Sequence, residues 1–160
     1  MAKASGARRV LPAHGGERPW HASCFGMKFS PVVALRAATE RAAARWSAAT
    51  GCELAVGEGG IPVSLVDEVL TPAGEHANGA TDLLRDAAGQ VVGCIGLRIG
   101  RSAADPERTL LHEFGHALGA TLHAKGGLMA RAPLAGASLD QAAVDLVCQR
   151  LDCARRRSES

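Results

Sequence analysis

Two histidines four residues apart, with a glutamate directly after the first, are the residues of this sequence best suited to chemistry. They are His112, Glu113 and His116, in the stretch HEFGHALGATLH. On a helix, side chains at positions i and i+4 stand on one face, about 5–6 Å apart between their Cβ atoms, so both imidazoles can bind one ion. The glutamate is rotated about 100° from the first histidine and lies beside that ion. We therefore expect His112 and His116 to bind a metal and Glu113 to act as a base.

The pattern around this pair fits a zinc ion. Imidazole nitrogens suit Zn²⁺, and a catalytic zinc takes three protein ligands and keeps a fourth position for water. An HExxH sequence also occurs by chance on ordinary helices, but Gly119, His123 and the downstream Met129 favour the metal site here. If the helix ran straight on, His123 would lie about 10 Å farther along its axis than His116. Three-histidine ligation therefore requires the helix to end at Gly119.

The third ligand is the open point of this site. His123 can reach the metal if the chain turns back after the glycine, and otherwise the metal keeps two protein ligands. Carboxylates offer little alternative, because Glu159 in the tail is the only glutamate after Glu113 and Asp140 stands at a predicted helix start. By elimination, His123 is the third ligand that we expect.

The composition fits one domain and gives no support for binding to nucleic acid, for association with a membrane or for a cysteine zinc site. The chain has 160 residues, 47% of them hydrophobic but only 3% aromatic, so the core is expected to consist largely of Ala, Val, Leu and Ile. A net charge of +2 gives no electrostatic case for nucleic acid or a membrane surface. The sequence contains no run of about 18 apolar residues, so it predicts no membrane span. The five cysteines form no CxxC pair, which disfavours a cysteine zinc site, and Cys148 and Cys153 could pair with each other or with Cys52 or Cys94.

The remaining patterns predict an α+β domain. An alanine-rich segment from Pro31 to about Ala49, with Ser30 as N-cap and Gly51 as stop, predicts an amphipathic helix. Strands are predicted at residues 21–29, 52–56 and 61–66, a loop at 70–79, and a hairpin at 80–86 and 91–99 with Gly89 in its turn.

Two more helices complete the domain. Asp105 and Pro106 predict the start of the helix that carries the HExxH sequence. Ser138 and Gln141 form a capping box before a last amphipathic helix that reaches Leu151.

The histidine motif resembles that of the metzincin clan of zinc metallopeptidases, whose signature is HExxHxxGxxH followed by a Met-turn. Its first four fixed positions are His112, Glu113, His116 and Gly119, and GGLMA is similar to the Met-turn, with Met129 beneath the zinc.

The third histidine departs from the clan pattern, because Leu122 occupies the clan's position and His123 follows one residue later. The chain also contains no tyrosine, so the astacin-like and serralysin-like branches, in which a tyrosine follows the Met-turn, fit less well than small bacterial matrixin-like members.

This resemblance implies a fold. It implies a metzincin-like mixed twisted sheet with two long helices in an upper subdomain of residues 21–123, and a lower subdomain of residues 124–155 with one helix. Residues 1–20 are expected to be a flexible extension and residues 156–160 a polar tail. An edge strand at residues 80–86 is expected to pair with an extended peptide.

The resemblance also implies a function, that of a zinc-dependent endopeptidase with one catalytic Zn²⁺ whose bound water is activated by Glu113. Its partners would be peptide or protein substrates and not nucleic acid, and we expect a monomer. The resemblance implies a secreted or cell-envelope protein, although the first twenty residues lack the apolar region of a secretory signal. Calcium is not supported, since no acidic cluster is similar to a calcium loop. The alternative is a non-catalytic, metzincin-derived zinc-binding protein that recognises a peptide or partner.

Overall fold

The structure is a computed structural model of the chain, and it describes residues 10–12, 27–71, 73–85, 87–88, 91–98, 105–120, 122–131, 138–151 and 153. The strands are β1 (Val10–Pro12), β2 (Lys28–Pro31), β3 (Ala55–Val56), β4 (Ile61–Val66), β5 (Glu68–Leu70), β6 (Gly79–Arg85) and β7 (Val91–Arg98). The helices are a short 3-10 helix, η1 (Val33–Leu35), and the α-helices α1 (Arg36–Thr50), α3 (Pro106–Ala117) and α4 (Gln141–Leu151).

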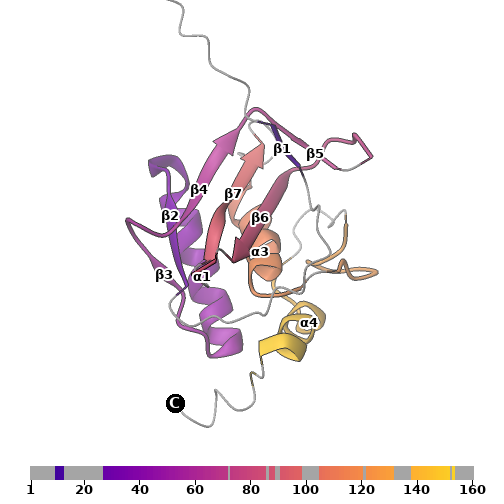
Figure 1. Ribbon diagram of the computed structural model, residues 1–160. Coiled ribbons are helices and arrows are strands. Elements are labelled where there is room, and N and C mark those ends of the chain that lie inside the picture. Colours follow the sequence, from indigo (N-terminus) through magenta and orange to yellow (C-terminus); the bar gives the residue numbers. More distant parts are fainter. Residues whose placement is uncertain are drawn as a thin grey trace, which may run out of the picture.

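Five of the strands form one mixed sheet in the order β3-β2-β4-β7-β6 (Figure 1). The first four run parallel to one another, whereas β6 pairs antiparallel with β7 and forms one edge. This confirms the α+β class, the predicted strand at residues 61–66 and the hairpin with its edge strand. Gly89, expected in the hairpin turn, lies outside the described residues.

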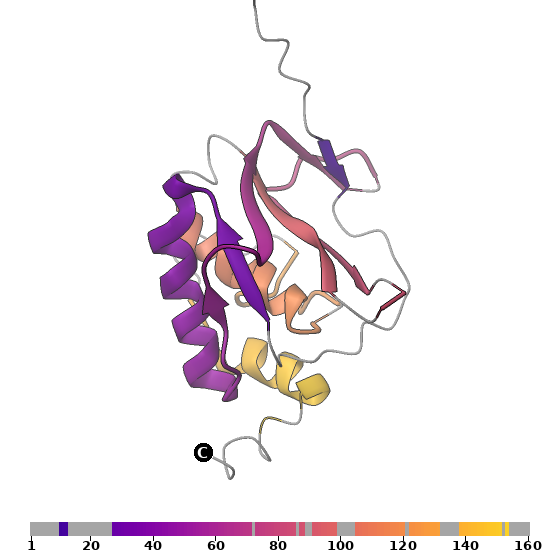
Figure 2. The same cartoon turned by 60° about the vertical axis from the view of Figure 1, so that its left-hand side comes forward.

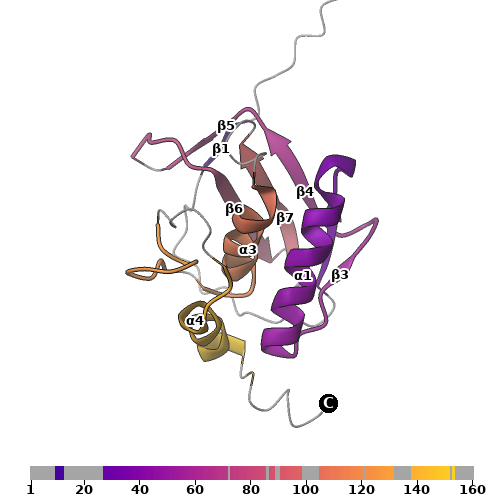
Figure 3. The same cartoon turned by 180° about the vertical axis from the view of Figure 1, so that it is seen from behind.

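The helices α1 and α3 cover the same face of this sheet (Figure 3), and α4 lies near the ends of both (Figure 2). Trp46 of α1 is fully buried, and its indole Nε1 donates to the carbonyl oxygen of Leu111 in α3 at 2.9 Å. Phe29 of β2 stacks on Phe114 of α3 with 4.1 Å between the ring centroids. These contacts pack α3 against both α1 and the sheet.

The first helix begins later than the sequence predicted. Ser30 and Pro31 end β2 and do not cap a helix, because both pair with β4 and the N–H of Val32 then donates to the carbonyl of Val63 at 2.9 Å. The predicted stop at Gly51 is confirmed, since this residue takes a φ of 74° at the end of α1. Of the strand predicted at residues 21–29, β2 contains the last two, and residues 21–26 lie outside the described part.

A small parallel sheet of β1 and β5 was not predicted. The expectation of a flexible extension is therefore wrong for Val10–Pro12, and the rest of residues 1–20 lies outside the described part of the chain. The predicted strand at residues 52–56 is shorter, since β3 contains only Ala55 and Val56. Two cysteines near the end of α4, Cys148 and Cys153, form a disulfide, one of the pairings that the sequence left open. Within the described ranges, no helix has the length and apolar character needed to cross a membrane.

Candidate metal centre

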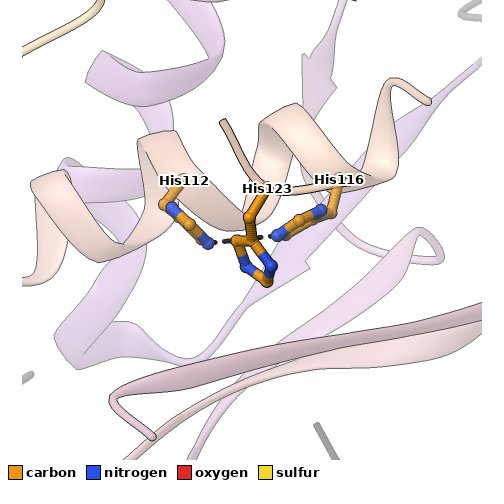
Figure 4. A group of neighbouring side chains, drawn as sticks. All are labelled: His112, His116 and His123. Atoms are coloured by element: carbon orange, nitrogen blue, oxygen red, sulfur yellow. Dashed lines mark hydrogen bonds between the residues drawn. The ribbon is translucent and has the colours of Figure 1, made fainter. Parts of the chain in front are cut away.

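The helix α3 presents His112 and His116 one turn apart on one face. Its start is fixed as predicted, with Pro106 in the first turn and the Asp105 carboxylate accepting from the backbone N–H of Arg108 at 3.3 Å. The two imidazoles are 8% and 9% exposed, and their Nε2 atoms lie 3.0 Å apart (Figure 4). The helical spacing thus brings two potential ligand atoms together.

The helix ends where three-histidine ligation requires it to end. Gly119 takes a left-handed φ of 110°, and its N–H donates to the carbonyl of His116 at 3.0 Å. The next N–H, of Ala120, donates to the carbonyl of Gly115 at 3.0 Å. This pair of bonds closes the last helical turn around a left-handed glycine. The chain is therefore free to turn back after residue 119.

The one-residue shift of the third histidine is absorbed in the following loop. Leu122, at the position where the clan has its histidine, is 73% exposed. His123 instead turns toward the helix, with its ring centroid 5.3 Å from that of His112 and 4.9 Å from that of His116. One ligand atom from each ring lies within 4.8 Å of the others, so the three histidines could hold a metal ion (Figure 4).

Hydrogen bonds to the far side of two rings fix which nitrogen faces the cluster. Nδ1 of His112 lies 2.7 Å from the carbonyl oxygen of Leu128, and Nδ1 of His116 lies 2.5 Å from that of Ala120. A carbonyl oxygen only accepts, so each Nδ1 carries the proton and the Nε2 of a neutral ring carries a lone pair. Two lone pairs at 3.0 Å favour a cation beside them. Two nitrogen ligands on a tetrahedral zinc are about 3.3 Å apart, so the spacing fits this ion.

The surroundings of His123 lower the pKa of its imidazole and so favour the neutral form. Burial lowers the pKa of its imidazole, and the positive charge of Arg131 lowers that pKa further. A neutral imidazole is the form that ligates a metal, whereas a protonated one does not. The surroundings of His123 thus favour ligation at neutral pH.

The methionine of the predicted Met-turn packs directly beneath the motif helix. Met129 is fully buried, and a Cβ atom added at Gly115 would lie 2.5 Å from its sulfur. Gly115 therefore leaves the space that Met129 fills. The sequence signal of this contact is a glycine in the middle of a predicted helix, and the contact itself was not predicted. The carbonyl of Met129 accepts from the N–H of Ala124 at 2.8 Å, which closes the loop after His123.

Asp140 connects this loop to α4. Its Oδ1 accepts from the N–H of Ala143 at 2.8 Å, and its Oδ2 accepts from the N–H of Leu128 at 2.7 Å. Asp140 is thus the cap of α4, and the capping box predicted at Ser138 and Gln141 is wrong. The alternative of Asp140 as a metal ligand is also wrong, because both carboxylate oxygens bind backbone N–H groups. Its role is indirect, since Leu128 in turn accepts the hydrogen bond of the first histidine.

Replacing Asp140 with alanine should weaken both the fold and the metal site. Loss of the cap and of a hydrogen bond to a charged group is expected to lower the free energy of unfolding by about 2–4 kcal/mol. Zinc affinity should fall about 10-fold or more, as it does when other residues that position a metal ligand are replaced. Urea unfolding and zinc titration measure these effects. Asp145→Ala, an exposed aspartate on the same helix, is the control, and equal effects of the two variants would contradict the role of Asp140.

Glu113, the residue after His112 on α3, is buried. It is 2% exposed, and its carboxylate accepts a hydrogen bond from Oγ1 of Thr81 at 2.7 Å. Burial raises the pKa of Glu113 from 4.5 to about 7, and the Thr81 hydrogen bond limits the rise. A carboxyl group with a pKa near neutrality is well suited to accept a proton and return it.

The raised pKa of Glu113 predicts how the metal-free protein responds to pH. The unfolded chain releases this proton near pH 4.5, whereas the folded protein holds it to about pH 7. Unfolding therefore releases a proton between these two pH values. The contribution of Glu113 to the free energy of unfolding falls by about 3 kcal/mol as the pH rises from 4.5 to 7, and it stays constant above pH 7. Unfolding by urea with a chelator present, compared with Glu113→Gln, measures the difference. Parallel pH profiles of the two proteins would show that Glu113 ionises normally.

Of the sequence-predicted site residues, His112, His116 and His123 come together. Glu113 is the buried residue that follows His112, Gly119 ends the helix, and Met129 packs against Gly115 of that helix. No family model, curated protein or solved structure matches the chain. The class that the described residues define is an α+β domain in which three histidines could hold a metal ion beside a buried glutamate.

Proposed function

We propose that this protein is a zinc-dependent endopeptidase, similar to small matrixin-like metzincins. The observation that carries the proposal is the convergence of His112, His116 and His123 next to a buried Glu113. Three protein ligands are typical of a catalytic zinc, whereas structural zinc sites have four. The mixed five-stranded sheet with two helices on one face agrees with the fold that the metzincin resemblance implies.

The proposed reaction is the hydrolysis of a peptide bond. His112, His116 and His123 would hold the Zn²⁺, which would supply a Lewis acid for the scissile carbonyl and would lower the pKa of a water molecule to about 7. Glu113 accepts a proton from the attacking water and later passes it to the leaving amine. Since the chain has no tyrosine, backbone N–H groups assist in stabilising the developing negative charge.

The edge strand β6 offers a binding site for the substrate backbone. An extended peptide can add to an exposed sheet edge through main-chain hydrogen bonds. Thr81 of β6 contacts Glu113 directly, so a peptide paired with this strand passes close to the proposed base. A peptide or protein is therefore the proposed substrate.

Measuring zinc content together with proteolysis tests the proposal. We expect one Zn²⁺ per chain and cleavage of an unfolded protein, with cleavage lost in a chelator and restored by added zinc. One bound zinc without cleavage of any unfolded protein or peptide library would contradict the proposal. That result would favour a non-catalytic protein that recognises a peptide or partner at this site.

A further inference from the structure

Thr81 is the residue of the edge strand that contacts the proposed base. Its Oγ1 lies 2.7 Å from Oε2 of Glu113 and 2.9 Å from the backbone oxygen of the same residue. Thr81 is opposite Ile95 in the pairing of β6 with β7, and Ile95 is fully buried. The hydroxyl is therefore held at a fixed place in the sheet, within hydrogen-bond distance of one carboxylate oxygen and of the backbone oxygen of Glu113.

The strand comes this close to α3 because residue 79 is a glycine. A Cβ atom added at Gly79 would lie 2.8 Å from Cγ2 of Thr109 and 3.0 Å from Oε1 of Glu113. A side chain there would push β6 away from the helix or crowd the second carboxylate oxygen. Gly79 and Thr81 thus act together: the glycine permits the approach, and the threonine makes the hydrogen bond.

A glutamate side chain has three rotatable bonds, and a base is effective only within hydrogen-bond reach of the proton that it removes. Small displacements of a catalytic group cost large factors in rate. By binding Oε2, Thr81 limits the rotation of the Glu113 carboxylate, and Oε1 would be the oxygen that takes the proton.

We propose that Thr81 is a positioning residue for hydrolysis, which holds the carboxylate of Glu113 in its working orientation and links it to the strand on which the substrate is bound. This inference rests on the proposed peptidase function. Thr81 itself takes no proton from the substrate and is not a metal ligand.

The kinetic test uses two variants of the zinc-loaded protein. Thr81→Val keeps the shape of the side chain but removes the hydroxyl, and Thr81→Ser keeps the hydroxyl. We expect kcat to fall about 10- to 100-fold in Thr81→Val, which corresponds to one hydrogen bond to a charged group, with KM changed less than about threefold. Thr81→Ser should recover most of kcat. A wild-type kcat in Thr81→Val, or an equal loss in both variants, would overturn the inference.

A second measurement uses the metal-free protein and needs no activity. We expect Thr81→Val to lower the thermal midpoint of the wild-type chain by about 5 °C, and by less than half as much in a Glu113→Ala background. Equal shifts in both backgrounds would show that the hydroxyl acts independently of the carboxylate, and would overturn the inference. Failure of the proposed function gives a different result. A wild-type protein that binds zinc but cleaves no peptide would rule out the catalytic role, even if the thermal shifts show that Thr81 and Glu113 are coupled.

Discussion

Glu113→Gln is expected to abolish peptide cleavage while the protein still binds one zinc per chain. The amide has the size of the carboxylate and can still accept a hydrogen bond from Thr81, but it cannot take a proton from water. Loss of a general base costs about 10²- to 10⁴-fold in rate, so we expect kcat/KM to fall by about 10³ or more. Hydrolysis of an unfolded protein and metal analysis after gel filtration measure the two properties. Glu113→Ala should show the same separation.

The matched control for this variant is Glu53→Gln, which changes an exposed glutamate and should keep full activity. If Glu113→Gln keeps more than about a tenth of the wild-type kcat/KM, Glu113 is not the general base. If it loses zinc as well, the loss of cleavage reports on the metal site and not on the base.

His123→Ala is expected to weaken zinc binding by more than 100-fold, because it removes one of three ligands. Replacing a residue that hydrogen-bonds to a metal ligand lowers metal affinity about 10- to 100-fold, so loss of the ligand itself should lower it by more. Competition with a chromophoric chelator at pH 7 measures the affinity. The neighbouring Leu122 is exposed, so Leu122→Ala should bind zinc as the wild type does.

Exchanging these two residues sharpens the test of the shifted histidine. The double variant Leu122→His with His123→Leu restores the spacing of the clan signature. In this fold it should bind zinc no better than His123→Ala, because the side chain at position 122 points to solvent. Recovery of wild-type affinity in the double variant, or wild-type affinity in His123→Ala, would contradict ligation by residue 123.

Local signals in the sequence predicted much of the fold, but the same signal failed where a distant strand intervened. Aspartate followed by proline predicted the start of α3, and Gly51 predicted the end of α1, because caps and left-handed glycines act within one turn. Ser30 and Pro31 carry the same kind of signal as the start of α3, yet they end a strand. Their pairing with β4 is a contact between distant parts of the chain, which no local pattern contains.

In the candidate site too, local patterns predicted some features, whereas others depend on contacts between distant parts of the chain. The pair of histidines and the helix end at Gly119 follow from helix geometry, and the structure has both. His123 was expected as the third ligand only by elimination, because its place in space depends on the loop that Met129 closes and Asp140 holds against α4. The contact of Thr81 with the base depends on sheet order, and hydrophobic periodicity contains no information on it.

The central claim is that one zinc ion is bound by three histidines and keeps a further position open for the reaction. X-ray absorption at the zinc edge of the purified, zinc-loaded protein tests this most directly. We predict three imidazole nitrogens and one further oxygen or nitrogen ligand at about 2.0–2.1 Å. One imidazole should be lost in His123→Ala. A wild-type spectrum with two imidazoles, or with sulfur ligands, would contradict the account.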